Sequence, residues 1–182
     1  MFEVEELVSD LRKAIHESSP LLAVREVVAR AMAQPYDALS RALGSSNESE
    51  LKTLFRSPEL TVLKVVWSPG LAIWPHYHGT WAVIGVYGGL EENRYFRRVP
   101  QGLEHAGDKS LNPGDTAVLG EQIIHAVRNP REVPTATIHV YGGDFFTAPR
   151  SEWDEESGRE SPSSGERSRK LFSADRLTAP PA

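Results

Sequence analysis

A series of short β-branched and aromatic segments between Leu60 and Tyr141 constrains the fold of this chain more than any other feature. The segments LTVLKVVW, TWAVIGVY, DTAVL, QIIHAV and TATIHVY are separated by proline, glycine and asparagine residues. Short strands with frequent turn residues between them are typical of a β-sandwich or β-barrel, whereas βαβ units would place helical segments between the strands. We therefore expect a β core over residues 51–150.

The segments on either side of this core differ from it in composition. Apolar residues recur at three- and four-residue steps within residues 3–43, which predicts two or three helices and a helical layer over residues 1–50 that packs on the β core. The expected fold class is therefore mainly β, and α+β when the helices are included. Residues 151–182 are rich in serine, glutamate, arginine and proline, so we expect a polar, flexible or surface-wrapping tail in which Leu171, Phe172 and Leu177 can dock locally.

The composition excludes several kinds of chemistry. The 182 residues include no cysteine, which excludes disulfides, zinc ribbons, iron–sulfur clusters and cysteine nucleophiles. The formal net charge of −5 gives no broad basic surface for nucleic acid. No apolar run approaches the ~20 residues of a membrane helix, and the acidic N-terminus lacks the basic head and apolar run of a secretory signal, so we expect a cytoplasmic protein.

Three of the six histidines have the spacing of metal ligands. His76 and His78 form a His-x-His pair, and side chains two apart on a strand point to the same face. His125 lies on a later β segment, IIHAV. One interpretation is that all three alternate along solvated strands; the other is that they meet at one metal ion. The bulky apolar residues around them favour the metal site, while His16 and His105 are expected at the surface.

The segment TATIHVY has one polar and one apolar face. Thr135, Thr137, His139 and Tyr141 alternate with alanine, isoleucine and valine. Such a strand can have a wet outer face. Alternatively, Thr137, His139 and Tyr141 form a hydrogen-bonded row inside a barrel, where the hydroxyl fixes the imidazole and the imidazole orients the phenol near a metal. The strand pattern alone does not decide between the two.

Two motifs in the sequence resemble those of the cupin superfamily. Residues 70–89 contain G-x5-H-x-H and end on a glycine, and residues 113–129 contain P-G-D followed by H-x3-N. The resemblance implies a double-stranded β-helix, or jelly-roll barrel. One departure is informative, because the glutamate that most cupins supply as a fourth ligand would fall at Ala82 or Val83.

A three-histidine site without a carboxylate is similar to that of the thiol dioxygenase branch, which includes cysteine dioxygenase and 3-mercaptopropionate dioxygenase. Thr137, His139 and Tyr141 resemble the Ser-His-Tyr triad of that branch, with threonine in place of serine. The phrase IHVYGG, and Arg150 eleven residues after His139, resemble its 3-mercaptopropionate side. Tyr77 stands between the two ligands, where close relatives usually have aspartate.

The resemblance implies a non-haem Fe(II) thiol dioxygenase, an oxidoreductase that converts a small carboxylated thiol and O2 to the sulfinic acid. Imidazoles suit iron, zinc, copper and nickel alike, so the resemblance, not the ligand set, selects iron. The implied ligands are His76, His78 and His125. In the implied mechanism the Tyr141 hydroxyl hydrogen-bonds to oxygen or substrate.

An anionic substrate needs a local cation, and arginine offers a bidentate fork. Arg150 is the first candidate by its spacing from the triad, although it can equally be a surface arginine at the start of an acidic tail. Arg56 is the second, and Trp81 is expected in the pocket wall or in the core. If both arginines line the pocket, a thiol with two carboxylates, such as mercaptosuccinate, becomes a candidate.

Two other functions remain open from the sequence. One is a cupin iron oxygenase that acts on a non-thiol substrate, which the threonine of the triad and Tyr77 leave possible. The other is a cupin that binds a metal or small molecule without catalysis.

Overall fold

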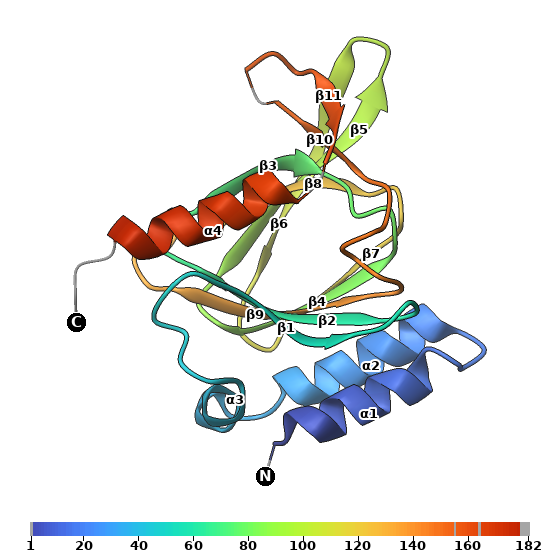
Figure 1. Ribbon diagram of the computed structural model, residues 1–182, viewed down its shortest axis with the longest axis vertical. Coiled ribbons are helices and arrows are strands. Elements are labelled where there is room, and N and C mark those ends of the chain that lie inside the picture. The colour runs from blue at the N-terminus through green and yellow to red at the C-terminus, as the bar shows by residue number, and fades with distance from the viewer. Residues whose placement is uncertain (1, 155, 164, 179–182) are drawn as a thin grey trace.

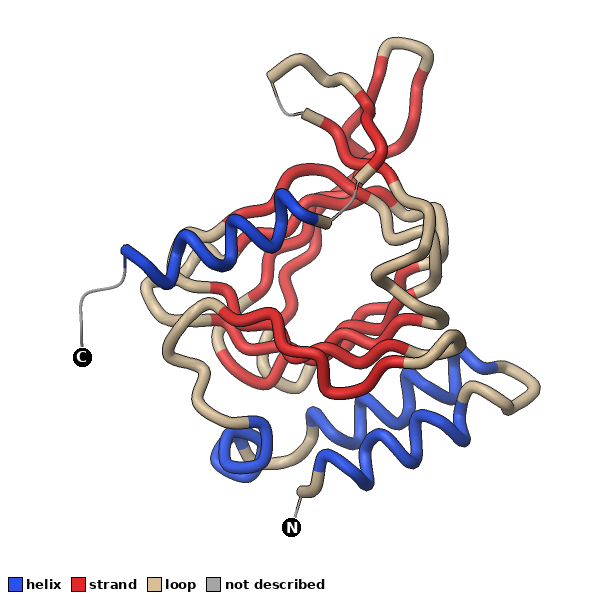
Figure 2. The backbone as a smooth tube through the Cα atoms, in the orientation of Figure 1, coloured by secondary structure: helices blue, strands red, loops and turns tan. Residues whose placement is uncertain are grey.

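The computed structural model describes residues 2–154, 156–163 and 165–178. Within these residues, eleven strands form two antiparallel sheets that face each other and enclose a barrel (Figures 1 and 2). The strands are β1 Glu50–Arg56, β2 Thr61–Trp67, β3 Ala72–His76, β4 Ala82–Gly88, β5 Glu91–Val99, β6 Gly102–Leu111, β7 Thr116–Leu119, β8 Ile124–Arg128, β9 Thr135–Tyr141, β10 Ser151–Trp153 and β11 Glu160–Pro162.

The strand order identifies the barrel as a jelly roll. The first sheet has the order β1-β2-β9-β4-β7, and the second has the order β11-β10-β3-β8-β5-β6. Each sheet contains a four-stranded core, β2-β9-β4-β7 in one and β3-β8-β5-β6 in the other, and the chain alternates between them. This is the arrangement of two Greek keys in a double-sheet jelly roll. The expected double-stranded β-helix is therefore confirmed.

Three helices cover the outer face of the first sheet, as Figure 1 shows. They are α1 Val4–Ala14, α2 Pro20–Met32 and α3 Tyr36–Leu43. Helix α2 packs closely on β4 at Gly85, which has no side chain to keep the helix away. A Cβ atom at this position would lie only 2.6 Å from Val28 and 2.7 Å from Met32 of the helix. None of the described helices combines the length and the apolar composition that crossing a membrane requires.

Strand β9 lies between the two hydrophobic clusters of the molecule. Its apolar residues Ala136, Ile138 and Val140 face the helices, whereas Tyr141 belongs to the cluster inside the barrel. All seven residues of β9 are buried. Its polar face is therefore not a wet outer surface: it faces the barrel interior, where the candidate site lies.

The segment after residue 150 differs from the expected polar tail. Strand β10 joins the second sheet by pairing with β3, and helix α4 Glu166–Thr178 follows β11. Helix α4 contacts β1, and its Arg167 guanidinium stacks 3.5 Å from the centroid of the Trp74 ring on β3, so the helix bridges the two sheets (Figure 1). Phe172 is buried, with its ring centroid 5.2 Å from that of Trp67. Phe172 therefore docks as expected, and Leu171 is partly buried against the same cluster, whereas the side chain of Leu177 lies outside the described residues.

Candidate metal centre

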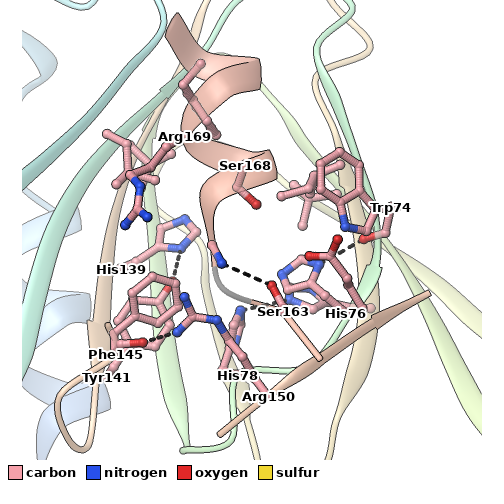
Figure 3. A pocket seen from close by; sticks show the side chains of 18 of the residues that line it. Trp74, His76, His78, His139, Tyr141, Phe145, Arg150, Ser163, Ser168 and Arg169 are labelled. Atoms are coloured by element: carbon pink, nitrogen blue, oxygen red, sulfur yellow. Dashed lines mark hydrogen bonds between the residues drawn. The ribbon is translucent and has the colours of Figure 1, made fainter. Parts of the chain in front are cut away.

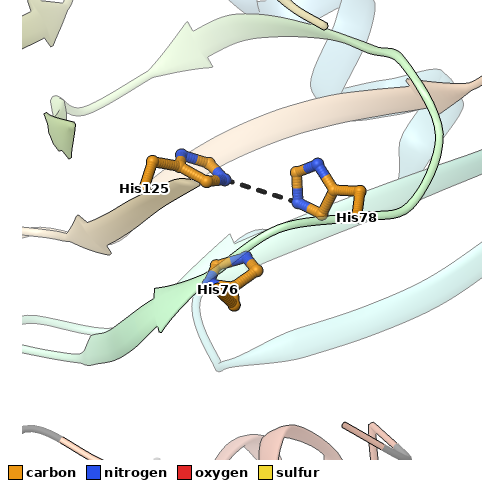
Figure 4. Close-up of side chains that lie close together, drawn as sticks. All are labelled: His76, His78 and His125. Atoms are coloured by element: carbon orange, nitrogen blue, oxygen red, sulfur yellow. Dashed lines mark hydrogen bonds between the residues drawn. The ribbon is translucent and has the colours of Figure 1, made fainter. Parts of the chain in front are cut away.

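Three imidazoles meet inside the barrel (Figure 4). His76 ends β3, His78 follows it two residues later, and His125 lies on β8, where it is paired with His76 across the strands. One nitrogen from each ring lies within 4.8 Å of the others, and the Nε2 atoms of His78 and His125 are 3.4 Å apart. This separation and convergence suit three ligands of one metal ion.

Two of the three rings have an Nδ1 partner that suits this role. His125 Nδ1 lies 2.8 Å from Asn93 Oδ1, and His76 Nδ1 lies 2.9 Å from the carbonyl oxygen of Trp74. Both partners are acceptors, so each Nδ1 carries the proton and donates it. The Nε2 lone pairs of these rings are then available to a metal, which is the arrangement seen in metal-binding histidines.

Burial keeps these imidazoles neutral. It lowers the pKa of His76 from 6.5 to about 4, with the nearby Arg150 guanidinium adding to the effect. Burial also holds the pKa values of His78 and His125 well below 6.5, and the neighbouring histidines push both in the same direction. Metal ligation requires the neutral form of histidine, so no proton has to be displaced at neutral pH.

No carboxylate reaches this group from the position of the usual cupin glutamate. Ala82 and Val83 are both fully buried, Ala82 inside the barrel and Val83 against the helices. Among the described residues, the candidate metal group consists of the three histidines.

The expected row on β9 is only partly present. His139 Nδ1 lies 3.0 Å from the Tyr141 hydroxyl, and the Tyr141 ring packs with its centroid 5.0 Å from that of His78. The Thr137 hydroxyl instead donates to the Val65 carbonyl at 3.0 Å, because β2 pairs with β9 and Val65 lies directly opposite. Burial raises the pKa of Tyr141, so the phenol keeps its proton. His139 and Tyr141 are therefore hydrogen-bonded to each other, whereas the Thr137 hydroxyl is bonded to the backbone of β2.

Two polar residues of the site were missed by sequence reasoning. Glu91 and Asn93 on β5 are 0% and 1% exposed, and Asn93 contacts the candidate ligand His125. The segment EENR is polar at every position, so period-two alternation could not show which residues face the barrel. The only signal in the sequence was that Glu91 and Asn93 lie two residues apart, so that on a strand their side chains share a face.

Arg150 lies in the pocket beside the histidines (Figure 3). It is 8% exposed, donates a hydrogen bond to the Phe145 carbonyl, and stacks 4.1 Å from the Phe145 ring centroid. Among the described residues no carboxylate forms an ion pair with it. Burial lowers its pKa, and the Arg169 guanidinium of α4 acts in the same direction. The carboxylates of Glu152 and Asp144 raise this pKa without reaching ion-pair distance, so the guanidinium can still take an anionic partner on this side of the pocket.

Two residues proposed from the sequence lie elsewhere. Arg56 is exposed and forms a bidentate pair with Asp144, at 2.9 and 2.8 Å, so its fork is already occupied. Trp81 packs against the cluster between helices and sheet, with its indole lying over Gly142. Neither residue lines the pocket.

Helix α4 contributes one wall of the pocket instead. Ser168 and Arg169 (Figure 3) line it together with Phe172 and the barrel residues, and Glu152 of β10 is also part of the lining. The pocket also has an apolar part, formed by Val65, Ile73 and Val127. It thus combines three metal-ligand candidates, a buried cation and an apolar lining, as small-molecule sites commonly do.

No protein-family model matches the sequence, and no curated protein matches it by sequence. Solved structures do resemble it. One is a cupin protein of Methanocaldococcus jannaschii with a double-stranded β-helix fold (10% identity, TM-score 0.48, covering 56% of this chain and 85% of that one). Another is a double-stranded β-helix protein of Klebsiella pneumoniae (18% identity, TM-score 0.43, covering 62% and 90%). A third is oxalate oxidase in complex with the substrate analogue glycolate (15% identity, TM-score 0.45, covering 55% of this chain and 53% of that one).

Proposed function

We propose that this protein is a non-haem Fe(II) thiol dioxygenase that converts a small carboxylated thiol and O2 to the sulfinic acid. The observation that carries the proposal is a candidate ligand group of three neutral imidazoles, with no carboxylate among its described members, beside a buried arginine that forms no ion pair with a described residue. The resemblance of the two histidine motifs and of His139 and Tyr141 to thiol dioxygenases supports a thiol as the substrate.

The histidines would hold the metal through nitrogens that need no deprotonation. Bound Fe(II) supplies the redox chemistry by which both atoms of O2 are transferred to sulfur. A ligand set of three neutral imidazoles supplies no negative charge to the cation. Such a site accommodates an anionic thiolate better than one that already contains a glutamate.

Arg150 would orient the substrate by its carboxylate. Arg150, His76 and Tyr141 line the same pocket, which supports this role. A guanidinium binds a carboxylate through two parallel hydrogen bonds, and burial strengthens them. Arg169 adds a second cationic group to the pocket from α4, in the role that the sequence had suggested for Arg56. A thiol with a second carboxylate therefore remains a candidate substrate.

Tyr141 would place a hydroxyl against the reacting groups. Its ring packs on His78, its oxygen bonds to His139 Nδ1, and its raised pKa keeps the phenol protonated. The ring of Phe145 stacks on that of Tyr141, with their centroids 4.2 Å apart. The tyrosine is therefore held in one orientation.

A panel of thiols tests the proposal. Iron-loaded protein is supplied with 3-mercaptopropionate, cysteine and mercaptosuccinate, and oxygen uptake is measured together with the sulfinate product. We expect at least one carboxylated thiol to give sulfinate in step with oxygen uptake. If iron is bound and no thiol gives sulfinate, the proposal is wrong. Oxygen uptake with a non-thiol substrate would then favour a different iron oxygenase, and no uptake at all would favour a non-catalytic binding protein.

A further inference from the structure

A buried carboxylate lies behind the metal centre, and the proposed chemistry does not use it. Glu91 is fully buried at the start of β5, with its side chain inside the barrel. A carboxylate is retained in such a place only where hydrogen bonds or opposite charges compensate for lost water. Its two oxygens face two different partners, and each partner leads to a different part of the site.

One oxygen leads to the metal ligand His125. Asn93 Nδ2 donates to Glu91 Oε1 at 2.9 Å, which fixes the orientation of the Asn93 amide. The amide oxygen of Asn93 then faces His125 Nδ1 at 2.8 Å. An oxygen at this position accepts, so Nδ1 of His125 carries the proton and Nε2 keeps a lone pair. That Nε2 is the atom directed at His78 and the metal position.

The other oxygen leads to the tyrosine. Glu91 Oε2 lies 3.7 Å from His139 Nε2, an ion-pair distance, and neither atom has a hydrogen bond to another described residue. A carboxylate oxygen opposite this nitrogen favours a proton on Nε2. His139 Nδ1 then accepts from the Tyr141 hydroxyl at 3.0 Å. Glu91 therefore lies opposite His139 Nε2, where the Thr137 hydroxyl had been expected to hold the ring.

We propose that Glu91 is a positioning residue that sets the protonated nitrogen of two imidazoles at once. Through Asn93 it makes His125 a ligand by Nε2, and directly it places the proton of His139 on Nε2. One carboxylate thus couples the geometry of the metal ligand to the orientation of the Tyr141 hydroxyl. The inference uses only the three-histidine centre and holds whether or not the substrate is a thiol.

Four substitutions separate the two branches. Glu91→Met removes both, and Asn93→Leu removes only the branch to His125. In Glu91→Gln the amide oxygen can still accept from Asn93, whereas its NH2 group faces His139 Nε2 and would donate to it, which moves the His139 proton to Nδ1. Glu92→Gln is the matched control. Glu92 is the next residue on the strand, faces outward and pairs with Arg128.

The test uses zinc as the probe, so that no activity is needed. Zinc affinity is measured by competition with a chelator, and the protonated imidazole nitrogens of the zinc-loaded protein are assigned by 15N NMR. We expect Glu91→Met and Asn93→Leu to weaken zinc binding by about 10–100-fold, the usual effect of removing a partner of a ligating histidine. Glu91→Gln should keep zinc affinity within about threefold of wild type and move the His139 proton from Nε2 to Nδ1. Glu92→Gln should change neither quantity.

Two results would overturn the proposal. The first is zinc affinity in Asn93→Leu equal to that of Glu92→Gln. The second is a His139 proton that stays on the same nitrogen in Glu91→Gln. Both variants are close in size to the native side chains, so the test does not depend on Glu91→Met folding.

Discussion

At the residue scale, a guanidinium and three imidazoles share one pocket. Arg150 is buried and receives no carboxylate from the described part of the chain, while the imidazoles of His76, His78 and His125 are held neutral by burial. The metal would add further positive charge to the same cavity. The electrostatics of these four residues thus favour an anionic ligand, although the whole chain has a net charge of −5.

We expect Arg150→Gln to raise KM for a carboxylated thiol by at least about tenfold, because a charge-assisted hydrogen bond contributes roughly 1.5–3 kcal/mol. Steady-state oxygen uptake measures this. Arg56→Gln, which breaks only the exposed pair with Asp144, should leave KM unchanged. A thiol without a carboxylate, such as 2-mercaptoethanol, should be turned over at nearly the wild-type rate by both Arg150→Gln and Arg56→Gln. A KM for the carboxylated thiol that is the same in both variants would contradict the role of Arg150.

The residues that sequence reasoning located best are those governed by strand periodicity. His76 and His125 lie on strands and face the barrel as expected, because alternation along a strand is fixed by backbone geometry; His78 reaches the same point from the loop after β3, although a strand position was expected for it. The location of Arg56 could not be predicted, because its partner Asp144 lies 88 residues away and only the folded chain brings the two together. Thr137 was assigned to the site because it shares a strand face with His139 and Tyr141. Its hydroxyl instead donates a hydrogen bond to the backbone carbonyl of Val65 on the neighbouring strand.

At the element scale, the C-terminal segment completes the pocket. Strand β10 pairs with β3 so that Glu152 lies opposite His76, and α4 contacts both β1 and Trp74 of β3 and lines the pocket. A helix this polar gains little from its own apolar residues, so its position depends on the contact of Phe172 with Trp67. Composition therefore indicated a tail, and tertiary packing made it a pocket wall.

We expect Phe172→Ala to loosen α4 without unfolding the barrel. Loss of the buried ring removes the main apolar contact of the helix, so cleavage within residues 166–178 by trypsin should accelerate by about tenfold or more, which corresponds to roughly 1.5 kcal/mol of local stability. KM for the thiol should rise as the wall loosens, while zinc affinity stays unchanged. Ser173→Ala, at an exposed position of the same helix, is the control. Equal cleavage rates for the two variants would show that Phe172 does not hold the helix.

At the scale of the whole molecule, the jelly roll places strands from opposite sheets around one cavity. His76 and His125 come from the second sheet, and His139 and Tyr141 come from β9 of the first. Helices cover the outer face of the first sheet, which explains why β2 and β9 are buried on both faces. The alternation of short strands and turns predicted a β-sandwich or β-barrel, and the resemblance of the two histidine motifs to cupins implied the jelly roll. The coupling through Glu91 was beyond prediction, because it depends on which face of a wholly polar strand turns inward.

The apo protein should lose stability as the pH falls from about 7 to about 5. In the folded state burial holds the pKa of His76 at about 4, and those of His78 and His125 lower than 6.5, so these rings stay neutral. The unfolded chain binds protons below about pH 6.5, and this difference favours unfolding until the pH reaches the folded pKa values. We expect the Tm of metal-free protein to drop by on the order of 5 °C.

The control for this pH effect is a chain with asparagine at all three histidine positions. Its Tm should change less over the same range, because the neutral amides do not titrate. A wild-type Tm that follows the same pH curve as this triple variant would show that the three imidazoles are not held neutral in the folded state.

The central claim is that an iron centre held by three histidines transfers both atoms of O2 to the sulfur of a carboxylated thiol. The most direct test is mass spectrometry of the product that iron-loaded protein forms from 3-mercaptopropionate, cysteine or mercaptosuccinate under 18O2. We expect a sulfinate in which both sulfur-bound oxygens are labelled, and no such product from His76→Ala. Unlabelled or singly labelled sulfinate, or disulfide as the only thiol product, would contradict it.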